Sequence, residues 1–213
     1  DQAGGNQGGA QVLQVFVRWR VGHWPYPGHL PLVHGDTIVG LGDSITDDYQ
    51  SWIEIFRHCL SLARSEAACS VINAGFSGDT TTQLISRFWD VIQVKPQWIV
   101  CLIGTNDARM HGLKPEKTLV SLAETADNLR ALRAFGRNQT QARWLWMTPP
   151  PVVEEQIAQD WFLSPFQMMW RNQDLDAVRY LILEQPDPVV DLRPVFNFPP
   201  NSQFLLSDGL HPS

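Results

Sequence analysis

The chain is short of cysteine and of clustered positive charge. Its 213 residues include three cysteines, too few for a disulfide framework, so we expect mostly buried, reduced thiols, with a Cys59–Cys69 disulfide as the alternative. The formal net charge is −6, and no run of lysine and arginine stands out. Because nucleic-acid-binding proteins gather positive charge on one face, we expect no nucleic-acid partner.

Long apolar segments are also lacking. The stretch from Trp98 to Ile103 is among the longest, and it is far shorter than the roughly 20 residues of a bilayer-spanning helix, so we expect no membrane span. No signal-peptide pattern opens the chain, which begins at Asp1 instead of methionine. We therefore expect a soluble protein, with the cytoplasm favoured and secretion after removal of a leader left open.

The histidines show no pattern for a metal site. No two of them have the i, i+4 spacing of a helical metal site. The acids Asp43, Asp47, Asp48 and Asp79 are explained for the most part as first-turn residues, where the helix dipole favours negative charge. We expect neither a metal nor a cofactor.

Short apolar runs alternate with amphipathic helical patterns along the chain. This alternation is typical of an α/β protein in which a parallel sheet is covered by helices on both faces, a three-layer α/β/α sandwich. Strands are expected near residues 37–41, 70–73, 98–103, 143–148 and 189–192, and helices over residues 52–63, 84–92, from Pro115 to a stop at Gly136, and 166–184.

Four short polar motifs follow these predicted strands. They are Gly-Asp-Ser at residues 42–44, Gly-Phe-Ser-Gly-Asp-Thr at 75–80, Gly-Thr-Asn-Asp at 104–107 and Asp-Gly-Leu-His at 208–211. The carboxyl ends of parallel strands form the ligand crevice of an open sheet, so we expect the motifs to meet there.

Together the motifs contain the parts of a serine hydrolase. Ser44 lies between a predicted strand and a helix-start signal at Asp47 and Asp48, His211 is suited to remove a proton from its hydroxyl, and Asp208 is placed to orient that histidine. Taken alone, Ser44 is better explained as a helix cap, and Asn106 as a turn residue. Their joint occurrence favours the catalytic interpretation.

The four motifs, in this order, resemble those of the SGNH hydrolases, the GDSL-type esterase and lipase superfamily, from about Asp36 to the last residue. The resemblance implies a flavodoxin-like parallel sheet of five strands in the order 2-1-3-4-5. It also implies a catalytic triad of Ser44, Asp208 and His211. The implied oxyanion hole consists of the backbone N–H groups of Ser44 and Gly78 and the side-chain amide of Asn106.

Substrate contacts are expected after the fourth strand. Pro150 lies in a rigid proline turn, and Trp161 and Phe162 follow it closely, so we expect these three residues to line an apolar pocket. A second aromatic stretch contains Phe166, Met169 and Trp170, and for these residues packing against the core is an equally good interpretation.

Both ends of the chain differ from the superfamily pattern. Relatives continue beyond the histidine into a helix, whereas this sequence stops two residues after His211. Residues 1–33 form an N-terminal extension before a hydrolase domain of residues 34–213, and the first ten or so are expected to be disordered. We expect residues 12–33 to cover the apolar surface that the absent helix leaves bare, within one chain or across a homodimer.

The function expected from this sequence is hydrolysis of small-molecule carboxylic esters with small to medium acyl chains, through an acyl-enzyme. Three alternatives lie within the same superfamily: a carbohydrate acetylesterase, a thioesterase and a lysophospholipase. A fourth is a binding module that keeps the fold and has lost catalytic rate. No residue in the sequence decides the acyl-chain preference.

Overall fold

The computed structural model describes residues 32–63, 68–112 and 116–213. Its centre is a five-stranded sheet of β1 (Thr37–Gly42), β2 (Ser70–Gly75), β3 (Trp98–Leu102), β5 (Arg143–Met147) and β7 (Val189–Val190). All neighbouring strands are parallel, in the order β2-β1-β3-β5-β7. The five expected strands and the implied strand order are confirmed.

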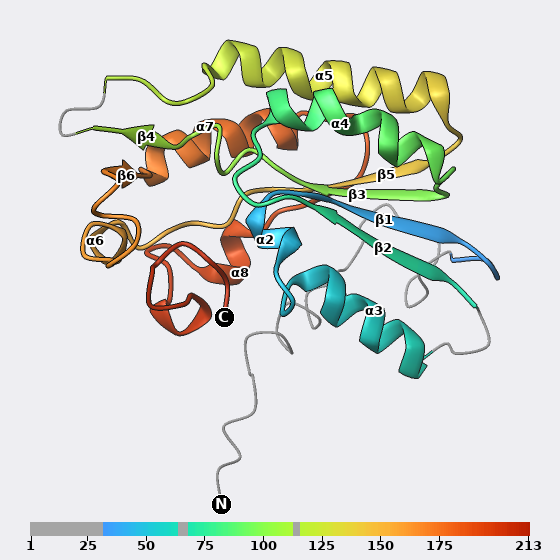
Figure 1. Ribbon diagram of the computed structural model, residues 1–213, viewed down its shortest axis with the longest axis horizontal. Helices are drawn as coiled ribbons and strands as arrows, with labels where there is room; N and C mark the ends of the chain where they lie inside the picture. The colour runs from blue at the N-terminus through green and yellow to red at the C-terminus, as the bar shows by residue number, and fades with distance from the viewer. Residues whose placement is uncertain (1–31, 64–67, 113–115) are drawn as a thin grey trace, which may run out of the picture.

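Helices cover both faces of this sheet (Figure 1). Helices α4 (Thr81–Gln93), α5 (Leu122–Gln139) and α7 (Asn172–Leu183) lie on one face, and α3 (Trp52–Ala63) lies on the other with the short α8 (Arg193–Phe196). Residues of β1 alternate between the two faces: Val39 and Leu41 are buried under α4, α5 and α7, whereas Ile38 is buried against α3. The three-layer sandwich predicted from the sequence is therefore confirmed.

Helix α5 differs from its prediction at both ends. It begins at Leu122, where the Ser121 side chain accepts a hydrogen bond from the N–H of Glu124, and not near Pro115, which lies outside the described residues. It also continues through Gly136 to Gln139. Gly136 is therefore no stop signal: a Cβ at this position would overlap the Trp144 indole of β5, so the glycine permits close packing of helix on sheet.

The predicted helix over residues 166–184 is wrong in its first part. Met168–Met169 form the short strand β6, which pairs antiparallel with β4 (Met110–His111), and α7 begins only at Asn172. The indole N–H of Trp170 donates to the carbonyl of Thr105 at 2.9 Å. This contact with the loop after β3 holds Trp170 outside the helix.

Most of the N-terminal extension lies outside the described residues. Of the segment 12–33 only Leu32 and Val33 are described: Leu32 packs partly buried against the core beneath α3, and Val33 is exposed. The covering role of this segment, the homodimer and the domain boundary at residue 34 stay predictions. Within the described ranges no helix is long and apolar enough to cross a membrane.

We expect Gly136→Ala to destabilise the protein although alanine is the better helix former. A helical Gly→Ala change adds about 1 kcal/mol of stability where space is free, but here the methyl group meets the buried Trp144 ring, and overpacking costs about 1–3 kcal/mol. Urea denaturation measures the net loss. Asn138→Ala, at an exposed position of the same helix, is the matched control and is expected to be neutral or slightly stabilising. Equal or higher stability of Gly136→Ala would contradict the packing argument.

Candidate active site

Ser44 lies on a sharp strand-to-helix turn at the carboxyl end of β1. Asp43 caps the short helix α2 (Ser44–Asp47), and its Oδ1 accepts from the N–H of Ile45 at 3.0 Å. The helix thus starts at Ser44 and ends at Asp47, so the predicted helix start at Asp47 and Asp48 is wrong. Because Asp43 supplies the cap, the Ser44 hydroxyl is left for other contacts.

A chain of hydrogen bonds joins Ser44 to His211 and Asp208. The Ser44 Oγ lies 2.9 Å from Nε2 of His211, and Nδ1 of His211 lies 2.6 Å from Oδ2 of Asp208. The other oxygen of Asp208 accepts from the backbone N–H groups of Leu210 and His211 at 2.8 and 3.0 Å. Asp208 and His211 are three positions apart in the sequence, and Ser44 is 167 positions from His211. The fold brings all three side chains together.

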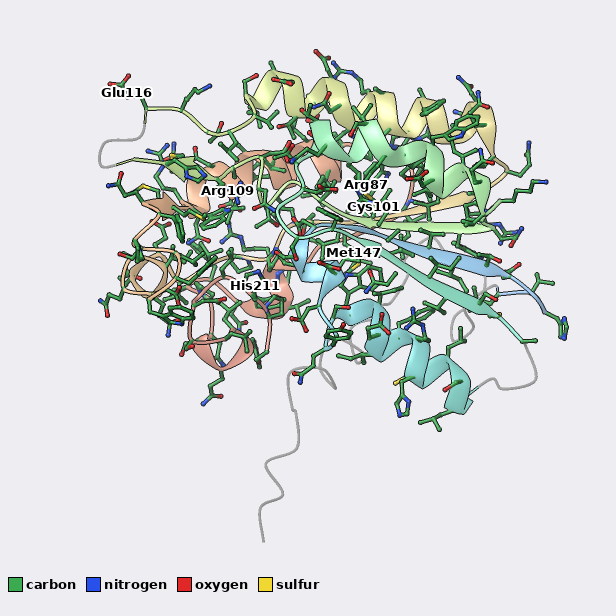
Figure 2. All side chains as sticks on the ribbon, viewed as in Figure 1. Arg87, Cys101, Arg109, Glu116, Met147 and His211 are labelled. Carbon is green, nitrogen blue, oxygen red and sulfur yellow. The ribbon has the colours of Figure 1, made fainter. Side chains whose placement is uncertain are left out.

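The loop that carries His211 is fixed by its own backbone. Leu205 and Pro212 form an antiparallel bridge, and the N–H of Leu206 donates to the carbonyl of His211 at 2.8 Å. The N–H of Val153, in the segment after β5, donates to the carbonyl of Gly209 at 2.8 Å. These contacts fix the loop backbone on both sides of His211 and thereby limit the positions of its imidazole. Figure 2 shows His211 among the loops beyond the strands, near the C-terminus.

The surroundings shift the pKa values of the histidine and the aspartate in opposite directions. Burial by itself lowers the pKa of His211, but the hydrogen bond and charge of Asp208 outweigh it, with smaller contributions from Asp43 and Asp48, and the pKa lies above its ordinary value. Burial by itself raises the pKa of Asp208, but the hydrogen bonds from His211 and Leu210 outweigh it, and the pKa lies below its ordinary value. Asp208 thus stays ionised beside a strengthened base.

Gly78 and Asn106 lie at the same edge of the sheet as Ser44. Gly78 follows β2 in a turn with φ of +87°, a conformation that favours glycine. The preceding residue, Ser77, is anchored to Oδ2 of Asp47 by its N–H at 3.1 Å and its hydroxyl at 2.7 Å. The amide of Asn106, after β3, donates to the carbonyl of Asp79 at 3.1 Å, which leaves its second N–H for another acceptor.

Arg87 of α4 ties these strand ends together, a contact that the sequence did not predict. Its guanidinium bonds Oδ2 of Asp79 at 2.5 Å, the carbonyl of Ala74 at 2.9 Å and the carbonyl of Gly42 at 3.0 Å. Figure 2 shows Arg87 between α4 and the sheet. In the sequence, Arg87 is recognisable only as an arginine on the predicted helix, eight residues after Asp79. The apolar periodicity of that helix does not predict which groups its polar side chains contact.

Asp107 forms a second buried anchor, directly after Asn106. It is fully buried and accepts from the N–H and hydroxyl of Thr81 and from the hydroxyl of Thr125 at 2.9, 2.5 and 3.0 Å. Burial raises the pKa of its carboxyl, and the threonine hydrogen bonds oppose the rise. Asp107 thereby joins the loop after β3 to the start of α4 and to α5.

The expected pocket residues are exposed to different degrees. Pro150 is buried, Phe162 is half exposed and Trp161 is 84% exposed. The Trp161 and Phe166 rings each contact Phe162, with centroids 5.9 and 5.4 Å apart, so these aromatic residues form a surface cluster. Trp170 instead packs in the core, and the substrate contacts of Pro150, Trp161 and Phe162 stay a prediction.

Each of the acids that we considered as metal ligands contacts a protein group, although Oδ2 of Asp43 is buried without a hydrogen-bond partner. Asp43 caps α2, Asp47 binds Ser77, Asp48 accepts from the N–H of Gln50 at 2.7 Å, and Asp79 pairs with Arg87. The described part of the chain contains no group of three or more histidine, cysteine, aspartate or glutamate side chains that could hold a metal ion. Cys59, Cys69 and Cys101 form no disulfide within the described residues, and Cys101 is buried in β3.

We expect Arg87→Gln to cost about 3 kcal/mol of stability, because it leaves the nearly buried Asp79 carboxylate unpaired. Urea denaturation checks this value. Arg130→Gln is the matched control: its ion pair with Asp127 is largely exposed, and such a pair contributes about 0–1 kcal/mol. Equal effects of the two substitutions would contradict the anchoring role of Arg87.

Comparisons with known proteins agree with this architecture. Residues 41–213 match the GDSL-like lipase/acylhydrolase family. Thioesterase 1/protease 1/lysophospholipase L1 of Escherichia coli (strain K12) is 30% identical over 100 residues, 46% of this chain and 48% of the relative. The chain thus spans about half the length of the curated relatives it matches.

Solved structures match over more of the chain. An acetylxylan esterase from Geobacillus stearothermophilus is 25% identical, with a TM-score of 0.65 over 86% of this chain and 90% of its own. An alpha/beta hydrolase from the metagenome of Lake Arreo, Spain, at 22% identity and a TM-score of 0.62 over 84% of this chain and 88% of its own, shares the fold. With four fifths of its residues inside the family match, the chain belongs to the GDSL-like lipase/acylhydrolase family.

Proposed function

We propose that the protein is a serine hydrolase of carboxylic esters with small to medium acyl chains. The observation that carries this proposal is the hydrogen-bonded chain from Ser44 through His211 to Asp208. Membership of the GDSL-like lipase/acylhydrolase family and the likeness to an acetylxylan esterase support it.

In the first half-reaction Ser44 acts as the nucleophile. Its Oγ forms a bond to the ester carbonyl carbon while Nε2 of His211 takes the hydroxyl proton, and the carbonyl oxygen becomes an oxyanion. Asp208 holds the proton on Nδ1 and stabilises the imidazolium that forms. As the oxyanion collapses, the alcohol leaves with the proton from Nε2, and an acyl-enzyme remains.

In the second half-reaction water replaces the alcohol. His211 takes a proton from the water as it attacks the acyl carbon, and a second oxyanion forms at the same position. Its collapse expels Ser44 Oγ, which recovers the proton from His211, and the carboxylic acid is released. The protein supplies the nucleophile, the base and the oxyanion donors, and the protons balance over the cycle, so the proposed reaction uses no cofactor.

The oxyanion is assigned three donors in this proposal: the backbone N–H groups of Ser44 and Gly78 and the side-chain amide of Asn106. The N-terminal position of Ser44 in α2 leaves its N–H outside the helical hydrogen bonds. The amide of Asn106 is oriented by its bond to the carbonyl of Asp79. Donors fixed before the reaction stabilise the developing charge without reorganising.

Acetyl esters of carbohydrates are a second, narrower candidate for the substrate. The acetylxylan esterase is 25% identical to this chain and shares its fold over 90% of its own length. The exposed cluster of Trp161, Phe162 and Phe166 offers aromatic faces to a ligand on the surface. We assign these residues and Pro150 to the substrate-binding region.

Hydrolysis of p-nitrophenyl esters of increasing chain length tests the function. We expect turnover by the parent protein that Ser44→Ala abolishes, and covalent labelling of Ser44 by a sulfonyl fluoride, because the hydroxyl is paired with a base. Ser77→Ala is the control for labelling, since its hydroxyl donates to Asp47 and pairs with no histidine among the described residues. No turnover by the parent, or a label that persists in Ser44→Ala, would refute the assignment.

The pH dependence of kcat/KM tests the base. Only neutral His211 accepts the serine proton, and its pKa is raised, so activity should fall as the pH drops through a midpoint above the ordinary histidine value of about 6.5. Asp208→Asn removes the charge that raises this pKa, so the midpoint should move to lower pH while the rate at the plateau falls. Profiles between about pH 5 and pH 9 measure both effects. An unmoved midpoint in Asp208→Asn would contradict the role of Asp208.

A further inference from the structure

Arg109 lies in the loop after β3, three residues beyond Asn106. Its N–H donates to the carbonyl of Asn106 at 3.2 Å, and its carbonyl accepts from the N–H of Leu119 at 2.8 Å. The next residue, Met110, pairs with Met169 between β4 and β6. The backbone is thus fixed on both sides. Figure 2 shows Arg109 beside β4 and α7, at the same end of the strands as His211, which lies beside α8.

The Arg109 side chain has no counter-ion in the described part of the chain. It is half-buried, and its Nε is buried with no hydrogen-bond partner. Arg137 and Arg143 also lack a carboxylate partner, but both are exposed to solvent. The remaining described arginines each pair with an aspartate or glutamate: Arg57, Arg87, Arg130, Arg133, Arg171, Arg179 and Arg193.

Asp43 is the acid whose charge acts on Arg109, and it does not satisfy the guanidinium. Burial lowers the pKa of Arg109, and the Asp43 carboxyl opposes this effect. Yet Oδ1 of Asp43 accepts from Ile45, and its buried Oδ2 has no hydrogen-bond partner. A guanidinium stays charged at all relevant pH values, and a partly buried charge without a partner is costly. Because the N–H of Arg109 donates to the carbonyl of Asn106, this unpaired cation lies in the loop that carries one of the proposed oxyanion donors.

We propose that Arg109 is a specificity-determining residue that binds an anionic group of the ester substrate, a carboxylate or a phosphate, near the scissile carbonyl. The proposal rests on the esterase function proposed above and names its substrate class. A guanidinium matches both anions because it donates two parallel hydrogen bonds to two oxygens. The anion supplies the counter-ion that the described chain does not, so Arg109 favours charged esters over neutral ones of the same shape.

Matched pairs of esters test the proposal. The first pair places the charge on the acyl side, mono(4-nitrophenyl) glutarate against its neutral methyl ester. The second places it on the alcohol side, 4-acetoxybenzoate against methyl 4-acetoxybenzoate, and 4-acetoxyphenyl phosphate replaces that carboxylate by a phosphate. The measured quantity is the ratio of kcat/KM for the charged ester to that for the neutral ester, which a general loss of activity does not change.

We expect the parent protein to prefer a charged ester in at least one pair by about 10- to 100-fold, the effect of hydrogen bonds to an ionised group. Arg109→Gln should bring this ratio to one or below, and Arg109→Lys, which keeps the charge and loses the paired donors, should retain part of it. Arg130→Gln, an exposed arginine on α5, should keep the parent ratio. Melting temperatures show that each variant is folded.

Binding to Ser44→Ala separates this proposal from the esterase function. Calorimetry with the same esters should show tighter binding of the charged member, and adding Arg109→Gln should remove the difference. Absent turnover with charge-selective binding would refute the esterase alone. Turnover of neutral esters with no charge preference, a preference that survives in Arg109→Gln, or no measurable binding of any charged ester would each overturn the role of Arg109.

Discussion

One guanidinium holds the active-site edge of this protein together. Arg87 bonds the carbonyl at the end of β1, a carbonyl in the last part of β2 and the carboxylate of Asp79 beyond Gly78. The turn with Ser44 and the turn with Gly78 follow different strands, and their relative position decides whether the oxyanion of the proposed reaction meets both N–H groups. Because a guanidinium is planar and its donors have fixed directions, it sets the three acceptors at defined distances. The geometry around Ser44 therefore depends on a residue that contacts no reacting atom.

Buried polar contacts extend this arrangement to the third loop. Asp107 accepts three hydrogen bonds from Thr81 and Thr125, and Asn106 next to it is tied to the carbonyl of Asp79. Such a carboxyl is costly to bury, and each hydrogen bond that it accepts offsets part of that cost. A hydrophobic residue at position 107 would fill the same space, but it would form no directional hydrogen bonds to orient the loop after β3. The polar network therefore places Asn106 relative to Gly78 more sharply than packing does.

The sequence predicted the sheet and the motif positions because both depend on local patterns. Apolar runs located all five strands, and four motifs at their ends located Ser44, Asn106, Asp208 and His211. The errors concern features that arise only in the folded chain. Gly136 reads as a helix stop, yet it accommodates Trp144, and residues 168–169 read as helix, yet they pair with β4. Arg87 escaped notice because its three partners lie up to 45 positions away, and the exposure of Trp161 follows from tertiary packing alone.

Several aspartates lie near Ser44, and their negative charge would repel an anionic ligand. The repulsion depends on how many of these aspartates are charged and unpaired. Asp79 is neutralised by Arg87, whereas Asp208 beside a neutral His211 keeps its negative charge. Burial raises the pKa of Asp43 to about 7, so this carboxyl carries only part of a charge near neutral pH. Arg109 has no such partner among the described residues, and its guanidinium keeps a full positive charge. An anion that reaches Arg109 therefore meets an unpaired positive charge, and because the side chain is half-buried, water screens that attraction less than it would at the open surface.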